Sequence, residues 1–196
     1  MIARRLISRS FAAINQNKMK KIIFVCGLIA GLISAGWCVV GEKVLNDSVG
    51  INARTWLGYT FMILALSLIF VGVKQYRDNY NNGVISFGRA FVVGLYITLI
   101  ASTTYVLIWL VAFYTIIPDY FEKYAQLVRQ QMIADGASAA AIKQQMAQIA
   151  SLTVMYKNPV FNFLFTFLEI FPVGLVISLI VAAILRKKPA AIESPV

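Results

Sequence analysis

The sequence contains no histidine and few charged residues, and these shortages exclude several classes of function. Without histidine, the chain has no Ser-His-Asp triad, no imidazole general base and none of the zinc sites that depend on imidazole ligands. It also lacks a Cys-x-x-Cys motif, a phosphate-binding P-loop and paired carboxylates. We therefore expect a protein that is not an enzyme, with no catalytic residues, no bound metal and no cofactor.

Charged residues make up 13% of the chain and hydrophobic residues 60%, whereas soluble domains average about 25% and about 45–50%. The net charge of +10 does not indicate nucleic acid, because the Lys and Arg residues flank apolar runs instead of lining one helical face. The cysteines, Cys26 and Cys38, would lie about 18 Å apart on one helix and are expected to be free thiols. This composition predicts an integral membrane protein whose first partner is the lipid bilayer.

Four apolar runs are long enough to cross a membrane, since about 20 helical residues span a hydrocarbon core of about 30 Å. They are Ile22–Val40, Trp56–Val73, Phe91–Ile117 and Val160–Leu185. The sequence therefore predicts an all-α polytopic protein, with a four-helix membrane domain over residues 22–188 and a C-terminal cytoplasmic tail over 189–196. In the first run, Gly27, Gly31 and Ala35 form a ridge of small residues that favours close packing within this domain.

Residues 119–158, between the third and fourth runs, are predicted to form an amphipathic helical hairpin. Asp135-Gly136 separates its two helices, and Ser138 is placed to cap the second. The apolar faces are Tyr120, Phe121, Tyr124, Leu127, Val128 and Met132 in the first helix, and Ile142, Met146, Ile149, Thr153 and Tyr156 in the second. We expect these faces to lie on the helix bundle, on lipid headgroups or on a partner protein.

Residues 1–21 are basic and contain no acidic residue, which is typical of a cytoplasmic tail. The alternatives are a transit peptide or an amphipathic arm on anionic lipid. Met19-Lys20-Lys21 resembles an ordinary bacterial start, so residues 1–18 are a candidate extension of the tail.

The polar residues 74–83, between the second and third runs, are predicted to form a loop that bends at Asn82-Gly83. Ser86 is placed to cap the helix that follows. The candidate cytoplasmic interface at this end of the runs comprises Lys74, Arg77, Asp78 and Arg89. These side chains could hold a lipid phosphate or the acidic loop of a partner, and the alternative is that they only anchor the helix ends at the membrane interface.

The positive charges predict the threading of the chain through the membrane. Lys and Arg are concentrated in the N-terminal tail, the 74–89 loop and the C-terminus, whereas most acidic residues fall in the 41–55 loop and the hairpin. The positive-inside rule then places both termini in the cytoplasm and makes the hairpin extracytoplasmic. Trp37, Trp56 and Trp109 fall near the outer interface, as in an aromatic belt. We expect a multi-pass protein of the bacterial inner membrane.

Glu169 is the one ionisable side chain inside the fourth run, about 14 Å from the run's outer end by helical rise. Hydroxyl groups of the other runs fall at a similar depth, and Pro172 removes a helical hydrogen bond nearby. This candidate polar site comprises Glu169, Pro172, Ser34, Ser67, Thr104 and Tyr105. In one interpretation the carboxyl responds to protons or cations, and in the other it is a neutral, hydrogen-bonded group that sets helix register.

Several stretches of the chain together resemble a known family. They are Leu57–Tyr59, Met62, Leu66–Asp78, Gly83–Phe91, Tyr105 with Trp109, Pro118–Tyr120 and Glu169–Leu175. As a set they are similar to the four-span bacterial membrane proteins classed as domain of unknown function 4199, over about residues 20–188. The resemblance implies a multi-pass membrane protein without an assigned activity, and it supplies no catalytic residue.

Two functional hypotheses follow from these observations. The preferred one is a non-enzymatic accessory or assembly subunit that contacts a membrane-protein partner, through its hairpin or the loop after the second run, or forms a homo-oligomer. The alternative is a small-solute or ion carrier in which Glu169 is an intramembrane protonatable site.

Overall fold

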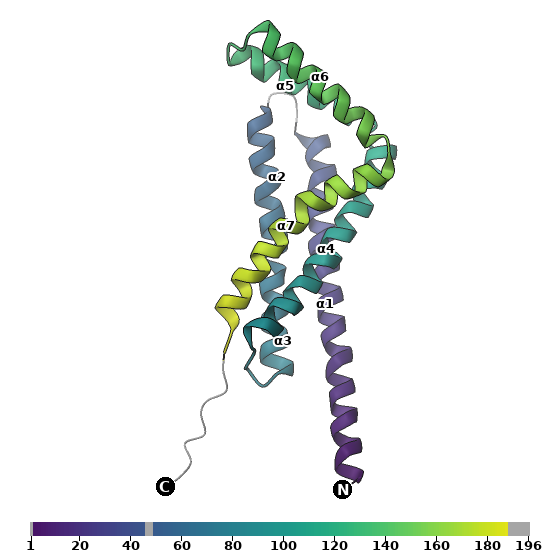
Figure 1. The fold of residues 1–196 in the computed structure, drawn as a ribbon, viewed down its shortest axis with the longest axis vertical. Coiled ribbons are helices and arrows are strands. Elements are labelled where there is room, and N and C mark those ends of the chain that lie inside the picture. Colours follow the sequence, from purple (N-terminus) through teal and green to yellow (C-terminus); the bar gives the residue numbers. More distant parts are fainter. Residues whose placement is uncertain (1, 46–48, 188–196) are drawn as a thin grey trace. The chain divides into compact units, whose positions relative to one another are not determined.

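The computed structural model describes residues 2–45 and 49–187, and nearly all of them are helical (Figure 1). The helices are α1 (Ile2–Val44), α2 (Ile51–Leu66), α3 (Leu68–Tyr80), α4 (Phe87–Thr115), α5 (Tyr120–Ala134), α6 (Ala139–Tyr156) and α7 (Pro159–Leu185). Within the described ranges no β-strand occurs, although Ile85 and Lys187 form an isolated antiparallel bridge. The all-α class is therefore confirmed, and the predicted tail over 189–196 lies outside the described residues.

Four helical segments are long and apolar enough to cross a membrane, which confirms the predicted number of spans. They are Asn17–Gly41 within α1, Ile51–Tyr80 across α2 and α3, Phe87–Thr115 and Pro159–Leu185. Most of these segments exceed the predicted apolar runs, because helical hydrogen bonding continues into polar flanks. The predicted N-terminal tail is part of such a flank, since its backbone is helical from Ile2.

The predicted loop over residues 74–83 begins later than expected, because α3 continues to Tyr80. The bend lies where the sequence placed it, with φ of 53° at Asn82 and 73° at Gly83. This left-handed conformation is open to glycine and tolerated by asparagine. The Ser86 hydroxyl accepts a hydrogen bond from a backbone N–H in the first turn of α4, so the predicted cap is also confirmed.

The chain divides into two compact units, each of which contains parts of α1, α4 and α7. The first unit comprises Met1–Ala30, Leu66–Ala101 and Phe171–Val196. Its helices approach one another closely at glycines: a Cβ atom added to Gly72 would lie 2.6 Å from Ile97 Cδ1, and one added to Gly27 would lie 2.7 Å from Ile100 Cβ. At Gly27, therefore, the predicted ridge of small residues does serve close packing.

The second unit comprises Gly31–Ala65 and Ser102–Ile170 and is built on an aromatic core. Trp109, Phe113 and Ile117 of this core are buried, and Cys38, Tyr120, Phe121 and Tyr156 pack against them. Trp109 is only 5% exposed, so it does not present a ring to an outer interface as predicted. The correction has a physical reason, because the indole N–H finds a buried hydrogen-bond acceptor in Asn162.

The predicted hairpin is present in the second unit as α5 packed against α6 (Figure 1). Gly136, with φ of 73°, ends α5, and Ser138 Oγ accepts a hydrogen bond of 3.2 Å from Ala141 N at the start of α6. The residues of the two predicted apolar faces are buried or half-buried, as amphipathic spacing requires.

Candidate functional site

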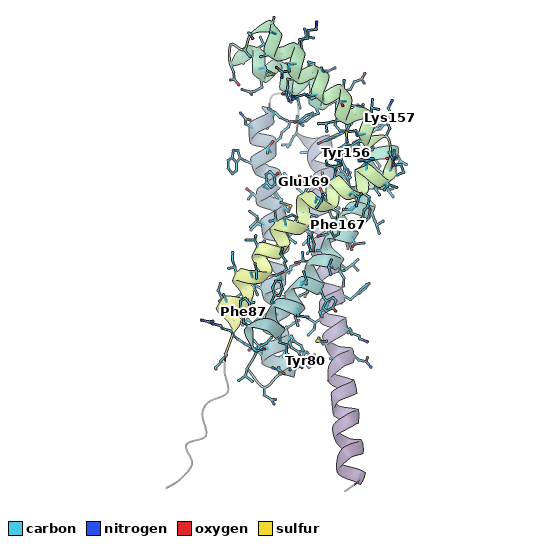
Figure 2. The ribbon with its side chains drawn as sticks, in the orientation of Figure 1. Tyr80, Phe87, Tyr156, Lys157, Phe167 and Glu169 are labelled. Atoms are coloured by element: carbon cyan, nitrogen blue, oxygen red, sulfur yellow. The ribbon has the colours of Figure 1, made fainter. Side chains whose placement is uncertain are left out.

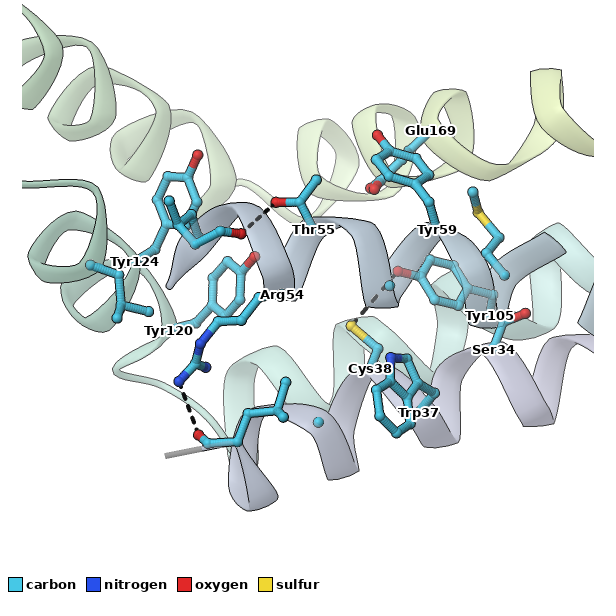
Figure 3. Close-up of a pocket in the computed structure, with 16 residues that line it drawn as sticks. Ser34, Trp37, Cys38, Arg54, Thr55, Tyr59, Tyr105, Tyr120, Tyr124 and Glu169 are labelled. Carbon is cyan, nitrogen blue, oxygen red and sulfur yellow. Dashed lines mark hydrogen bonds between the residues drawn. The ribbon is translucent and has the colours of Figure 1, made fainter. Parts of the chain in front are cut away.

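The second unit contains a cavity of about 210 Å³ lined by residues of α1, α2, α4, α5 and α7 and of the segment after α1 (Figure 3). A cavity of about 150 Å³ in another protein is large enough to bind benzene. This cavity therefore has room for a small organic molecule or for several waters. Much of it lies between helical segments that are apolar enough to span a membrane.

Three residues of the predicted polar site line this cavity, namely Ser34, Tyr105 and Glu169. The other three do not. Ser67 and Pro172 belong to the first unit, and Thr104 is half-buried on α4 without lining the cavity. Helical rise predicts how deep a residue lies, but not the side of the helix from which its side chain projects. Depth alone therefore could not separate these two groups.

Glu169 projects from α7 and lines the cavity (Figures 2 and 3). Its carboxylate forms no hydrogen bond and no ion pair with another residue that the structure describes, and its side chain is exposed. A neutral carboxyl that sets helix register should instead be hydrogen-bonded to a neighbouring helix. The geometry therefore favours the interpretation of Glu169 as a group that is available to protons or cations.

Ser34 is a second polar residue of the wall whose hydroxyl has no hydrogen-bond partner among the described residues. Its side chain is only 5% exposed. A buried hydroxyl without a partner costs roughly 1–3 kcal/mol, so such groups call for an explanation. Ser34 lines the cavity as a residue, but its Oγ has almost no accessible surface and is therefore not presented to a molecule bound there.

Aromatic rings form a large part of the cavity wall, and no motif in the sequence connects them with Glu169. They belong to Trp37, Tyr59, Tyr105, Tyr120 and Tyr124. Tyr105 donates its hydroxyl to Cys38 Sγ at 3.8 Å, and Trp37 stacks on Phe61 with ring centroids 3.6 Å apart. One signal was available in the sequence: the lining residues 34, 37, 38, 41 and 45 follow the spacing of a single helical face.

Arg54 also lines the cavity but is held by backbone carbonyls. Its Nε donates to Val49 O and its Nη2 to Leu45 O, each at 3.0 Å. Figure 3 shows Arg54 and Glu169 toward opposite ends of the cavity. The guanidinium therefore does not neutralise the carboxylate.

A buried polar network beside the aromatic core was not predicted. Asn162 is fully buried, and its Oδ1 accepts hydrogen bonds of 3.2 Å from Trp109 Nε1 and from Thr166 Oγ1. Tyr156 lies in the same region, and its pKa is raised first by burial and then by the negative charge of Glu169. Because these groups form hydrogen bonds with one another, they fix the packing of α4 against α7 in this unit. None of these hydrogen bonds involves Glu169, which remains part of the cavity wall.

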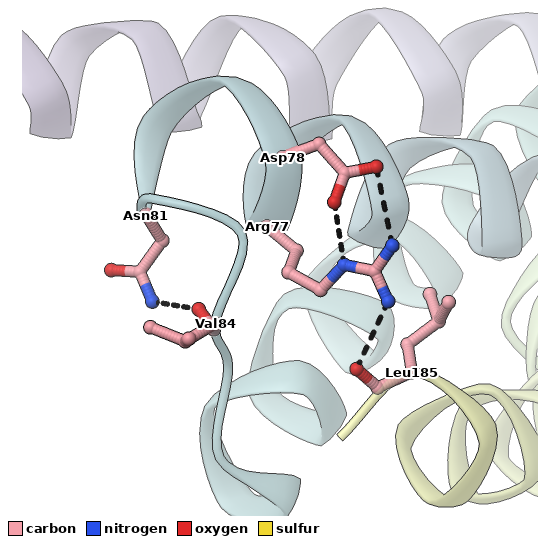
Figure 4. Close-up of polar contacts among 5 residues, drawn as sticks. All are labelled: Arg77, Asp78, Asn81, Val84 and Leu185. Atoms are coloured by element: carbon pink, nitrogen blue, oxygen red, sulfur yellow. Dashed lines mark hydrogen bonds and ion pairs between the residues drawn. The ribbon is translucent and has the colours of Figure 1, made fainter. Parts of the chain in front are cut away.

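The predicted cytoplasmic interface lies in the first unit and is largely occupied by internal contacts (Figure 4). Arg77 pairs with Asp78 at 2.6 Å and donates from Nη1 to the last carbonyl of α7 at 3.3 Å. Arg89 donates to the Asn81 side chain at 3.5 Å, whereas Lys74 is exposed. These contacts support the alternative in which the charged residues anchor helix ends.

The family described as "Protein of unknown function (DUF4199)" matches residues 25–187. No curated protein and no solved structure matches the chain. The family match covers most of the sequence and confirms the resemblance drawn from the motifs.

Proposed function

Because the chain belongs to the DUF4199 family of proteins of unknown function, we propose a function from its cavity: a non-enzymatic carrier of a small solute or ion. The observation that supports this proposal is the cavity wall formed by Glu169, a carboxylate without an ion pair inside a candidate membrane span. Ionisable side chains inside spans are costly and mark solute or proton pathways.

We further propose that the protein lies in the bacterial inner membrane with both termini in the cytoplasm. The even number of candidate spans supports a threading in which both termini lie on the same side of the membrane. The concentration of Lys and Arg near the termini and the 74–89 loop supports the cytoplasmic side. The α5–α6 hairpin then faces the opposite compartment.

The replacement Glu169→Gln is expected to abolish a pH-dependent flux through the purified protein in liposomes. The amide keeps the size of the carboxyl but can neither release a proton nor attract a cation. The measurement is the decay of an imposed pH gradient, followed with a pH-sensitive dye trapped inside the liposomes. Wild type should dissipate the gradient faster than protein-free liposomes, and the variant should match the protein-free rate.

Glu122→Gln is the matched control, because Glu122 is exposed on α5 and does not line the cavity. It should retain the wild-type flux. Far-UV circular dichroism and size-exclusion profiles would verify that both variants fold. A Glu169→Gln protein that folds and carries the full flux would exclude this role for Glu169.

A second candidate function, the accessory or assembly subunit, is favoured by apolar side chains on the hairpin. Ile133 of α5 is 58% exposed, and Leu152 and Val154 of α6 are 39% and 67% exposed. These three lie outside the candidate membrane spans, where exposed apolar side chains are candidates for contact with another protein.

For that second candidate, Val154→Glu is expected to remove a partner or a second copy of the chain from the purified complex without unfolding the protein. The carboxylate would be placed in an apolar contact and would have to be desolvated. The measurement is native mass in mild detergent together with crosslinking from a photoreactive residue at position 154. The matched control is Lys143→Glu, since Lys143 is exposed and polar on the same helix. A wild-type chain that stays monomeric and uncrosslinked would rule the candidate out.

A further inference from the structure

We infer that the cavity binds small organic ammonium ions. The inference rests on the proposed function, in which this cavity is the solute site, and it specifies the chemical class of the solute. Two features of the wall carry it: a carboxylate without an ion pair and several aromatic rings.

The charge of the wall selects for a cation at the Glu169 end. Glu169 has no ion pair with a described residue, so a bound cation could compensate a charge that is costly inside a span. An anion would meet the carboxylate and be repelled. Arg54, the positive group of the wall, is held by the carbonyls of Leu45 and Val49 toward the other end of the cavity.

The aromatic rings favour an organic cation over a metal ion. The faces of Trp and Tyr rings attract ammonium groups through the ring quadrupole, and cages of such rings bind quaternary ammonium ligands. Trp37, Tyr59 and Tyr105 line the cavity together with Glu169. Among the described residues no three Cys, Asp or Glu side chains gather as metal ligands, whereas Ca²⁺ and Mg²⁺ require about six oxygen ligands.

The size of the cavity limits the part of the ligand that it can hold. A volume of about 210 Å³ suits a molecule of a few to about ten heavy atoms. Choline meets these conditions and serves as the probe.

The test compares choline with its neutral isostere, 3,3-dimethylbutan-1-ol, in binding to the full chain in lipid nanodiscs. Equilibrium dialysis of radiolabelled choline, with the isostere as competitor, gives both affinities. We expect wild type to bind choline at least tenfold more tightly than the isostere. Glu169→Gln should reduce choline affinity at least tenfold and leave isostere affinity unchanged, while the Glu122→Gln control should bind both as wild type does.

Equal affinities of wild type for choline and the isostere would overturn the inference, and so would the absence of saturable choline binding. Both outcomes concern the wild-type protein and do not depend on whether a variant folds. If the flux still depends on Glu169 while the two affinities are equal, the carrier function stands and the ammonium class is wrong. Selective choline binding together with neither pH-gradient decay nor uptake of radiolabelled choline into the liposomes would support the ammonium site and remove the carrier function.

Discussion

Replacing Trp109 with alanine is expected to lower the free energy of unfolding by about 3–5 kcal/mol. Trp109 is 5% exposed in the core of the second unit, and its ring meets Tyr120 edge-on at a centroid distance of 5.1 Å. Alanine would leave a cavity beneath the α5–α6 hairpin and remove the indole donor from the Asn162 amide. Unfolding in mixed micelles with increasing SDS, followed by far-UV circular dichroism, measures the change.

Two further substitutions separate packing from hydrogen bonding at this position. Trp109→Phe keeps an aromatic ring and removes the N–H, so it should cost less than Trp109→Ala, with about 1 kcal/mol attributable to the lost hydrogen bond. Leu107→Ala is the matched control on the same helix, because Leu107 is 53% exposed. If Trp109→Ala destabilises the protein no more than Leu107→Ala, the aromatic core does not stabilise the second unit as described.

Replacing Gly174 with leucine is expected to destabilise the protein by about 3 kcal/mol, through overpacking in the first unit. A Cβ atom at this position would already collide with the Thr98 side chain. Thr98 and Ser178 are fully buried with their hydroxyl oxygens 3.0 Å apart, and Ser178 donates to the Gly174 carbonyl at 2.8 Å. A larger side chain would separate α4 from α7 here and break this buried polar contact.

The same SDS titration measures the Gly174→Leu change, with Gly88→Leu as the control. Gly88 lies in the first turn of α4, also in the first unit, and a Cβ atom added there meets no atom within 4 Å. Gly88→Leu should shift the unfolding free energy by less than about 0.5 kcal/mol. Equal effects of the two substitutions would show that α4 and α7 do not approach one another at Gly174.

The hairpin shows how far sequence patterns alone could predict this structure. Its amphipathic spacing identified the buried faces of both helices, and Gly136 and Ser138 marked the turn and the cap. In an amphipathic helix the hydrophobic periodicity of the sequence identifies the face that packs on the core, because the other face is exposed to water. The polar site was predicted only in part, since the depth of Ser34 and Tyr105 matched that of Glu169 while Ser67 proved to belong to the first unit.

By itself the sequence determined that the chain has four helical segments long and apolar enough to span a membrane, where they begin and end to within seven residues, and that a helical hairpin precedes the last of them. These features could be predicted from short stretches of sequence, because the length of each apolar run and the capping and turn residues at its ends determine them. Only the tertiary structure decided that aromatic rings line the same cavity as Glu169, that the buried Trp109 bonds to Asn162 and that Thr98 meets Ser178. The reason is physical: when a helix is apolar on every side, its sequence has no hydrophobic periodicity that could identify the face covered by neighbouring helices.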